Sequence, residues 1–185
     1  MDLSLLVGAI LNAPMEIETR KAYCWSLMRD VVCTDADLEP YAHLTAGEAY
    51  TRNLIATDDK TFTLMLLCWG AGASSPVHNH PQSECLMRMM RGSVRETRYR
   101  RGTPSDNTAT TLLVRLHEAT LEVGDDVVCI NDAIGMHRVE NLHPSDVAWT
   151  LHLYMPPYQS SLCFEETNGN FQQVPMLCRT QQQTG

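Results

Sequence analysis

The sequence has no apolar run that approaches eighteen residues, so no segment is long enough to be read as a transmembrane helix. The apolar stretch LSLLVGAIL near its start follows Asp2 with no lysine or arginine before it, which argues against a secretory signal peptide. Basic residues are also few: 14 lysines and arginines stand against 22 acidic residues, for a net charge of −8. Their one short cluster, at 95–101, is typical of a solvated hairpin edge. We therefore expect neither a membrane span nor a nucleic-acid partner.

No C-x-x-C motif occurs, and the seven cysteines are odd in number and lie mostly in apolar runs such as LMLLCWG. This pattern indicates buried free thiols and a reducing, cytoplasmic environment. We expect six of the seven to be structural: Cys24, Cys33, Cys68, Cys129, Cys163 and Cys178. Three histidines, His43, His117 and His143, are expected to be ordinary surface or loop residues.

The length of 185 residues favours one domain, 1–185, with a helical cap over 1–45 and a β-barrel with a C-terminal extension over 46–180. Helical spacing of apolar residues predicts helices over 3–11, 15–33 and 34–43, punctuated by Pro14 and Pro40. Short β-prone runs separated by turn residues follow from residue 50, which favours a jelly-roll sandwich or barrel. They include 62–69, 85–90, 93–99, 110–116, 126–130, 138–140 and 147–154. The polar tail at 181–185 is expected to fray, and the acidic domain suggests a monomer.

His78 and His80 stand one residue apart in the segment GASSPVHNHPQSECLMRMMRG. In an extended strand, alternate side chains point to the same face, so both imidazoles can reach one cation. The pair therefore supplies half of a metal site.

The spacing around this pair resembles the first motif of the cupin family. Five residues separate Gly72 from His78, and six separate Gly92 from Cys85, which occupies the usual position of a glutamate. A second segment, with Gly124 followed by His137 and then Asn141 after three more residues, resembles the second cupin motif. The resemblance implies a mainly β, cupin (jelly-roll) β-barrel with an N-terminal helical cap, and a third histidine for the metal.

Three neutral imidazoles on one face of an ion leave coordination positions open for a substrate. Non-haem iron enzymes use comparable facial sets, and three histidines also build zinc sites. The histidines alone therefore leave iron and zinc as alternatives.

The segment WTLHLYMPP places Thr150, His152 and Tyr154 on one face of a strand, with Trp149, Leu151 and Leu153 on the other. A polar row on an otherwise apolar strand is costly to bury unless its members bond one another or a ligand. We therefore interpret Thr150, His152 and Tyr154 as a hydrogen-bonded relay.

Five segments together resemble the thiol dioxygenases, and specifically the cysteine dioxygenase family: YTRNLI (50–55), LMLLCWG (64–70), HNHPQSEC (78–85), INDAIGMHRVEN (130–141) and LHLYMPP (151–157). The resemblance implies that the chain oxidises L-cysteine with O2 to cysteine sulfinic acid, in cysteine catabolism and taurine biosynthesis. It implies Fe(II) as the cofactor, held by His78, His80 and His137.

The same resemblance implies a protein-derived Cys-Tyr thioether between Cys85 and Tyr154, and a substrate carboxylate held by Arg52 with help from Tyr50. A guanidinium suits this task because it can donate two parallel hydrogen bonds to a carboxylate. His152 falls on the histidine of the family's relay, in which Tyr154 positions oxygen and assists proton movement.

Two positions depart from the family. Thr150 stands where the relay has a serine, a mild change because threonine keeps the hydroxyl. Glu84 precedes Cys85 where the animal enzymes often have a histidine, which we interpret as a changed charge at the rim of the site.

Three alternatives remain open at this point. The chain could oxidise another small thiol, 3-mercaptopropionate or cysteamine, although Arg52 and Cys85 both favour cysteine. It could instead be a zinc-binding cupin without oxygenase activity, or a non-catalytic cupin that senses a ligand.

Overall fold

The computed structural model describes residues 1–102 and 113–179. Its first part contains helices α1 (Leu3–Leu11), α2 (Ile17–Asp30) and α3 (Asp35–Leu38), followed by the 3-10 turn η1 (Glu39–Tyr41). Each helix begins at a side chain that accepts hydrogen bonds from free backbone amides of the first turn: Asp2, Glu16 and Thr34. The helices predicted over 3–11, 15–33 and 34–43 are confirmed, with shorter ends.

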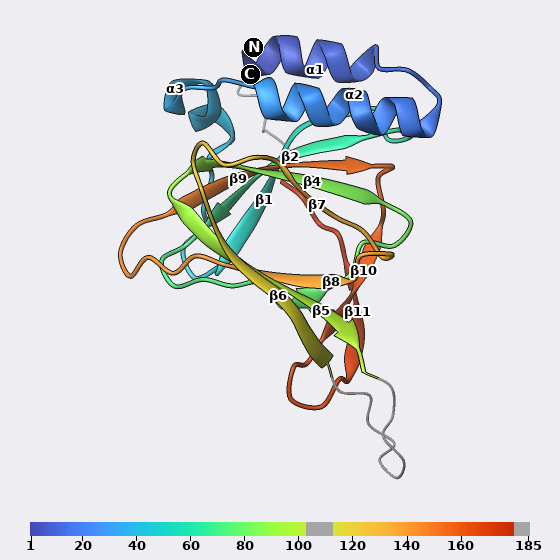
Figure 1. The fold of residues 1–185 in the computed structure, drawn as a ribbon. Helices are drawn as coiled ribbons and strands as arrows, with labels where there is room; N and C mark the ends of the chain where they lie inside the picture. The colour runs from blue at the N-terminus through green and yellow to red at the C-terminus, as the bar shows by residue number, and fades with distance from the viewer. Residues whose placement is uncertain (103–112, 180–185) are drawn as a thin grey trace.

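Two antiparallel sheets follow and face each other (Figure 1). The first sheet has the order β1 (Tyr50–Thr57), β2 (Thr63–Trp69), β9 (Ala148–Met155), β4 (Glu84–Arg91), β7 (Val128–Ile130). The second has the order β11 (Phe171–Pro175), β10 (Ser160–Phe164), β3 (Val77–His78), β8 (Met136–Glu140), β5 (Ser93–Arg101), β6 (Leu113–Glu122). The helices lie over the outer face of the first sheet (Figure 1). The mainly β jelly roll with an N-terminal helical cap is confirmed.

All seven β-prone runs named from the sequence overlap a strand of the structure. The run at 110–116 overlaps β6, although its first three residues lie outside the described part of the chain, as does the tail at 181–185. The expected strands did not include β1, β3, β10 and β11. β3 is two residues long, and β11 is largely exposed, so neither carries a clear alternation of apolar and polar residues.

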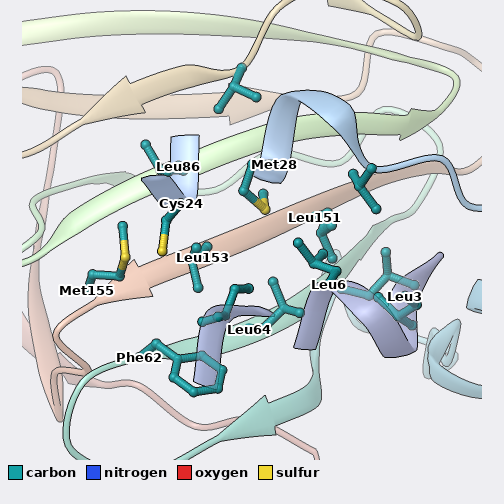
Figure 2. Packing of buried hydrophobic residues seen from close by; sticks show 14 of the residues in the cluster. Leu3, Leu6, Cys24, Met28, Phe62, Leu64, Leu86, Leu151, Leu153 and Met155 are labelled. Atoms are coloured by element: carbon teal, nitrogen blue, oxygen red, sulfur yellow. The ribbon is translucent and has the colours of Figure 1, made fainter. Parts of the chain in front are cut away.

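The central strands β2 and β9 are buried on both faces, and every residue of both is buried. One face of these strands packs against the helices. Leu6 of α1 and Met28 of α2 join Leu64, Leu151 and Leu153 in one apolar cluster (Figure 2). The opposite face of β9 carries the polar row of Thr150, His152 and Tyr154.

That opposite face lies between the two sheets. Thr150, His152 and Tyr154 project from it, next to apolar residues of the neighbouring strands. Met65 and Met87 are the register partners of His152 on its two sides. The polar row is therefore enclosed in an apolar interior, which keeps water away from it.

Two glycines allow close turns where a side chain would not fit. Gly92 joins β4 of the first sheet to β5 of the second with φ at 73°, and a Cβ there would press on Ala148. Gly135 precedes β8 with φ at 138°, and a Cβ there would overlap the carbonyl of Tyr99.

The cysteines of the described residues are all free thiols. Four are buried: Cys24, Cys68, Cys85 and Cys163. The expectation of burial was wrong for Cys178, which follows β11 and is exposed. His43, His117 and His143 are exposed, as expected. Within the described ranges, no helix is long and apolar enough to cross a membrane.

We expect Leu6→Ala to lower the free energy of unfolding by about 2 to 5 kcal/mol, because it empties a fully buried position between α1 and the first sheet. Leu5→Ala is the matched control, since Leu5 is in the same helix and 62% exposed; its cost should stay within about 0.5 kcal/mol. Urea unfolding of both variants measures the difference. Equal costs would show that α1 does not pack on the sheet as described.

Candidate metal centre

Three histidines meet between the two sheets. His78 lies on β3 and is the register partner of His137 on β8, so the backbone pairing of the two strands brings these rings together. His80 lies just past the end of β3 rather than within it, yet its ring centroid is 5.0 Å from that of His78 and 4.8 Å from that of His137. All three side chains are buried. Their candidate ligand atoms all lie within 4.8 Å of one another.

The Nδ1 atoms of two of these rings already have hydrogen-bond partners within the protein. His78 Nδ1 is 3.0 Å from the carbonyl oxygen of Pro76, and His137 Nδ1 is 2.9 Å from Oε1 of Glu96. Both acceptors lack a proton, so each Nδ1 must donate, which leaves the Nε2 lone pair of each ring for another partner. Such a hydrogen bond is the usual way to orient a histidine that binds a metal.

Burial keeps the rings of His78 and His80 neutral. It lowers the pKa of His78 to about 3, with a further contribution from the charge of His137, and it lowers the pKa of His80 well below its usual range. For Glu96, burial on its own acts to raise the pKa of the carboxyl. The hydrogen bond and charge of His137, together with Arg98, outweigh it and hold the pKa of the Glu96 carboxyl below its ordinary value.

A metal ion fits this donor set. Both ring nitrogens of His80 are buried and have no hydrogen-bond partner among the described residues. An unpaired buried nitrogen costs free energy, and a cation shared with His78 and His137 would remove that cost. Neutral imidazoles suit iron and zinc alike.

The loop that carries His80 is fixed at both ends. The backbone amide of His80 donates to Oδ1 of Asp132 at 2.9 Å. Asn79 receives a hydrogen bond from the amide of Leu162 on β10, at 2.8 Å. The ring of His80 is therefore held in place although it lies outside a strand.

The predicted relay is a hydrogen-bonded chain, and a residue that sequence reasoning missed sets its direction. Nε1 of Trp69 donates to Oγ1 of Thr150 at 2.8 Å, because an indole can only donate. Oγ1 of Thr150 is also 2.8 Å from Nε2 of His152, and donation to that nitrogen gives the Thr150 proton an acceptor. The proton of His152 is thereby assigned to Nδ1.

This Nδ1 faces both members of the predicted cross-link. It lies 3.3 Å from the hydroxyl oxygen of Tyr154 and 3.6 Å from the sulfur of Cys85. Cys85 and Tyr154 are register partners on β4 and β9, so the two side chains leave adjacent strands at the same level. Burial raises the pKa of both groups well above the ordinary range, so both keep their protons.

The ring of Tyr154 also faces the histidines, with its centroid 6.1 Å from that of His80. The structure therefore places the three histidines and the relay in one site. The tyrosine joins the two groups.

Arg52 and Tyr50 project from β1 into the same interior. Nη2 of Arg52 donates to the hydroxyl of Tyr50 at 2.9 Å, and the ring of Tyr50 stacks on Trp69 at 4.7 Å. Arg52 is the register partner of Leu67 on β2, and Leu67 is the register partner of Thr150 on β9, so Arg52 lies at the level of the relay. Among the described residues, Arg52 has no ion-pair partner.

The interpretation of Glu84 as a charge at the rim of the site was wrong. Its Oε1 is 2.8 Å from Nζ of Lys21 on α2, and its Oε2 accepts from Asn131 at 2.8 Å. Glu84 precedes Cys85 on β4, and adjacent residues of a strand point to opposite faces. Glu84 therefore faces the helices, while Cys85 faces the histidines.

Sequence reasoning missed Glu96, Trp69 and Tyr158. Glu96 lies in the segment RETRYRR, where alternation groups it with Arg98 on the more charged face of the strand, so no local signal marked it as buried. Tyr158 follows the YMPP segment, and no local pattern distinguishes it from a surface tyrosine.

We expect Glu96→Gln to weaken metal binding about 10- to 100-fold, because the amide keeps an acceptor but loses the charge that raises the basicity of His137. Glu122→Gln, at an exposed position of β6, removes the same charge away from the site and should leave the affinity unchanged. Competition with a chromogenic chelator measures both. Equal affinities in the two variants would contradict the role of Glu96.

Comparisons with known proteins identify the family of this chain. Residues 18–167 match the family model described as cysteine dioxygenase type I. Human cysteine dioxygenase type 1 is 37% identical over 127 residues, which span 69% of this chain and 61% of the human protein. The Rattus norvegicus protein of the same name is 36% identical over the same shares.

A solved cupin-superfamily sugar phosphate isomerase from Silicibacter pomeroyi DSS-3 is a looser match, with 14% identity and a TM-score of 0.43 over 68% of this chain and 76% of that one. The chain thus spans about three fifths of the length of the curated relatives, and it belongs to the cysteine dioxygenase type I family.

Proposed function

We propose that this protein is a non-haem Fe(II) thiol dioxygenase that converts L-cysteine and O2 to cysteine sulfinic acid. The observation that carries the proposal is the meeting, in one buried site, of a three-histidine cluster with the Cys85–His152–Tyr154 group and the unpaired Arg52. The family membership supports the same activity. The reaction is balanced without another reagent, because both oxygen atoms add to the sulfur of the thiol.

We assign the metal to His78, His80 and His137, and we propose iron rather than zinc because of the surrounding relay. Bound Fe(II) would supply the redox chemistry that lets O2 react with a thiol. A zinc site would not need the Trp69–Thr150–His152 chain behind Tyr154. The Tyr154 hydroxyl can accept from Nδ1 of His152 and point its own proton toward the histidines, which suits it to orient oxygen and to move a proton.

We propose that Arg52 holds the carboxylate of the substrate. A buried or half-buried guanidinium without an anionic partner is costly, and a carboxylate can accept two parallel hydrogen bonds from it. Tyr50 fixes one side of the guanidinium and stacks on Trp69, so the clamp is oriented before the substrate arrives. This preorganisation favours a thiol that carries a carboxylate, such as L-cysteine.

We also propose that Cys85 and Tyr154 form a thioether. Their register pairing and their shared contact with Nδ1 of His152 support this. The bond replaces the S–H of Cys85 and one ring C–H of Tyr154, and O2 at the site accepts the two electrons and two protons. The cross-linked chain is two hydrogen atoms lighter, which intact mass spectrometry detects.

We further propose that the protein acts as a monomer in the cytoplasm, on small molecules and not on macromolecules. The free thiols of the described residues suit a reducing compartment. Sedimentation of the purified protein would test the monomer.

The test of the function is oxygen uptake by the Fe(II)-loaded protein with L-cysteine, with mass spectrometry of the product. We expect one O2 to be consumed for each cysteine sulfinic acid formed. The zinc-loaded protein serves as the control and should consume none. No uptake by the iron form, together with firmly bound zinc in the purified protein, would overturn the dioxygenase assignment.

We expect Arg52→Ala to raise the KM for L-cysteine at least about a hundredfold, because two charge-assisted hydrogen bonds are lost. The KM for cysteamine, which has no carboxylate, should change little, so the preference for cysteine should collapse. Arg29→Ala removes an exposed arginine of α2 and is the control. An unchanged ratio of the two KM values in Arg52→Ala would contradict the clamp.

A further inference from the structure

Tyr158 lies at the metal centre although it is in the loop after β9. Its ring stands almost perpendicular to that of Tyr154, with centroids 5.4 Å apart and an angle of 82°. It stands in the same way against the ring of His80, at 6.0 Å and 88°. Two separate residues of the site therefore fix the position of the Tyr158 ring.

The hydroxyl of Tyr158 is buried and has no hydrogen-bond partner among the described residues. Native proteins rarely leave a buried hydroxyl unpaired, because it loses its bonds to water and gains none in exchange. The ring nitrogens of His80, the neighbouring side chain, are unpaired in the same way. These adjacent unpaired groups indicate that a bound ligand, and not the protein, completes the hydrogen bonds here.

The charge next to Tyr158 indicates which part of a ligand it meets. Tyr50 and Tyr158 both pack against the cluster that contains Cys85 and Tyr154, and the hydroxyl of Tyr50 accepts a hydrogen bond from the guanidinium of Arg52, so the three groups border one region of the interior. Arg52 repels an ammonium and attracts an anion. A carboxylate has more lone pairs than the guanidinium alone can satisfy, so it can accept a further hydrogen bond from a phenol.

We propose that the Tyr158 hydroxyl donates a hydrogen bond to the substrate carboxylate beside Arg52, and thereby helps to select thiols that carry a carboxylate. The proposal rests on the function proposed above. It assigns a specificity role to a residue that lies outside the strands that carry the relay and the clamp.

The test is Tyr158→Phe, which keeps the ring and its contacts with Tyr154 and His80 and removes only the hydroxyl. Binding of three thiols to the Fe(II)-loaded protein is measured by calorimetry without oxygen: L-cysteine, 3-mercaptopropionate, which lacks the amine, and cysteamine, which lacks the carboxylate. We expect the Kd of the first two to rise about tenfold and that of cysteamine to stay within about twofold. Tyr23→Phe is the matched control and should change none of them, because Tyr23 is a 39% exposed residue of α2.

Three results would overturn the proposal. Unchanged affinities in Tyr158→Phe would show that the hydroxyl does not meet the ligand. Weaker binding of L-cysteine and cysteamine, with 3-mercaptopropionate unaffected, would assign the hydroxyl to the amine instead. If the wild-type protein itself binds none of the three thiols, the proposed function fails and the role of Tyr158 fails with it. The iron content of each variant is measured in parallel, so a change in metal binding is not mistaken for a change in thiol binding.

Discussion

The site depends on the cost of burying three imidazoles whose candidate ligand atoms lie within 4.8 Å of one another. Nδ1 of His78 and Nδ1 of His137 each donate a hydrogen bond to a protein oxygen, whereas neither ring nitrogen of His80 has a partner among the described residues. Without a cation the lone pairs repel one another in a medium that cannot screen them. The second sheet holds this arrangement, because the backbone pairing of β3 with β8 fixes two of the rings independently of a metal.

The central strands of the first sheet carry different side chains on their two faces. On β9, Leu151 and Leu153 pack under the helices, and Thr150, His152 and Tyr154 turn toward the histidines. β4 divides in the same way, with Glu84 bound to Lys21 of α2 and Cys85 turned inward. The helical cap thus stabilises the back of the strands whose front holds the polar groups. On that front, the apolar side chains of Met65 and Met87 flank His152 from the two neighbouring strands.

The parts of the site that follow local rules could be predicted from the sequence. Period-two alternation placed the row of Thr150, His152 and Tyr154 on one face, and the spacing of the motifs identified the three histidines that the fold brings together. Glu84 was wrongly predicted at the rim of the site because it was judged only by its position next to Cys85. Adjacent residues of a strand point to opposite faces, so Glu84 points away from the site. The roles of Trp69 and Tyr158 could not be predicted, since each depends on a contact between distant segments. The partner of Trp69 is 81 residues away, and only the pairing of β2 with β9 brings the indole to Thr150.

The pairing of Cys85 with Tyr154 has a consequence for the unfolded chain. A thioether between them would close a covalent loop of about 70 residues, and a cross-link of that span removes roughly 4 kcal/mol of chain entropy from the unfolded state in the loop-closure treatment used for disulfides. If this bond forms with O2 at the site, as proposed, molecules that have worked would resist unfolding better than newly made ones. Older molecules of the protein would then unfold at a higher temperature than newly made ones.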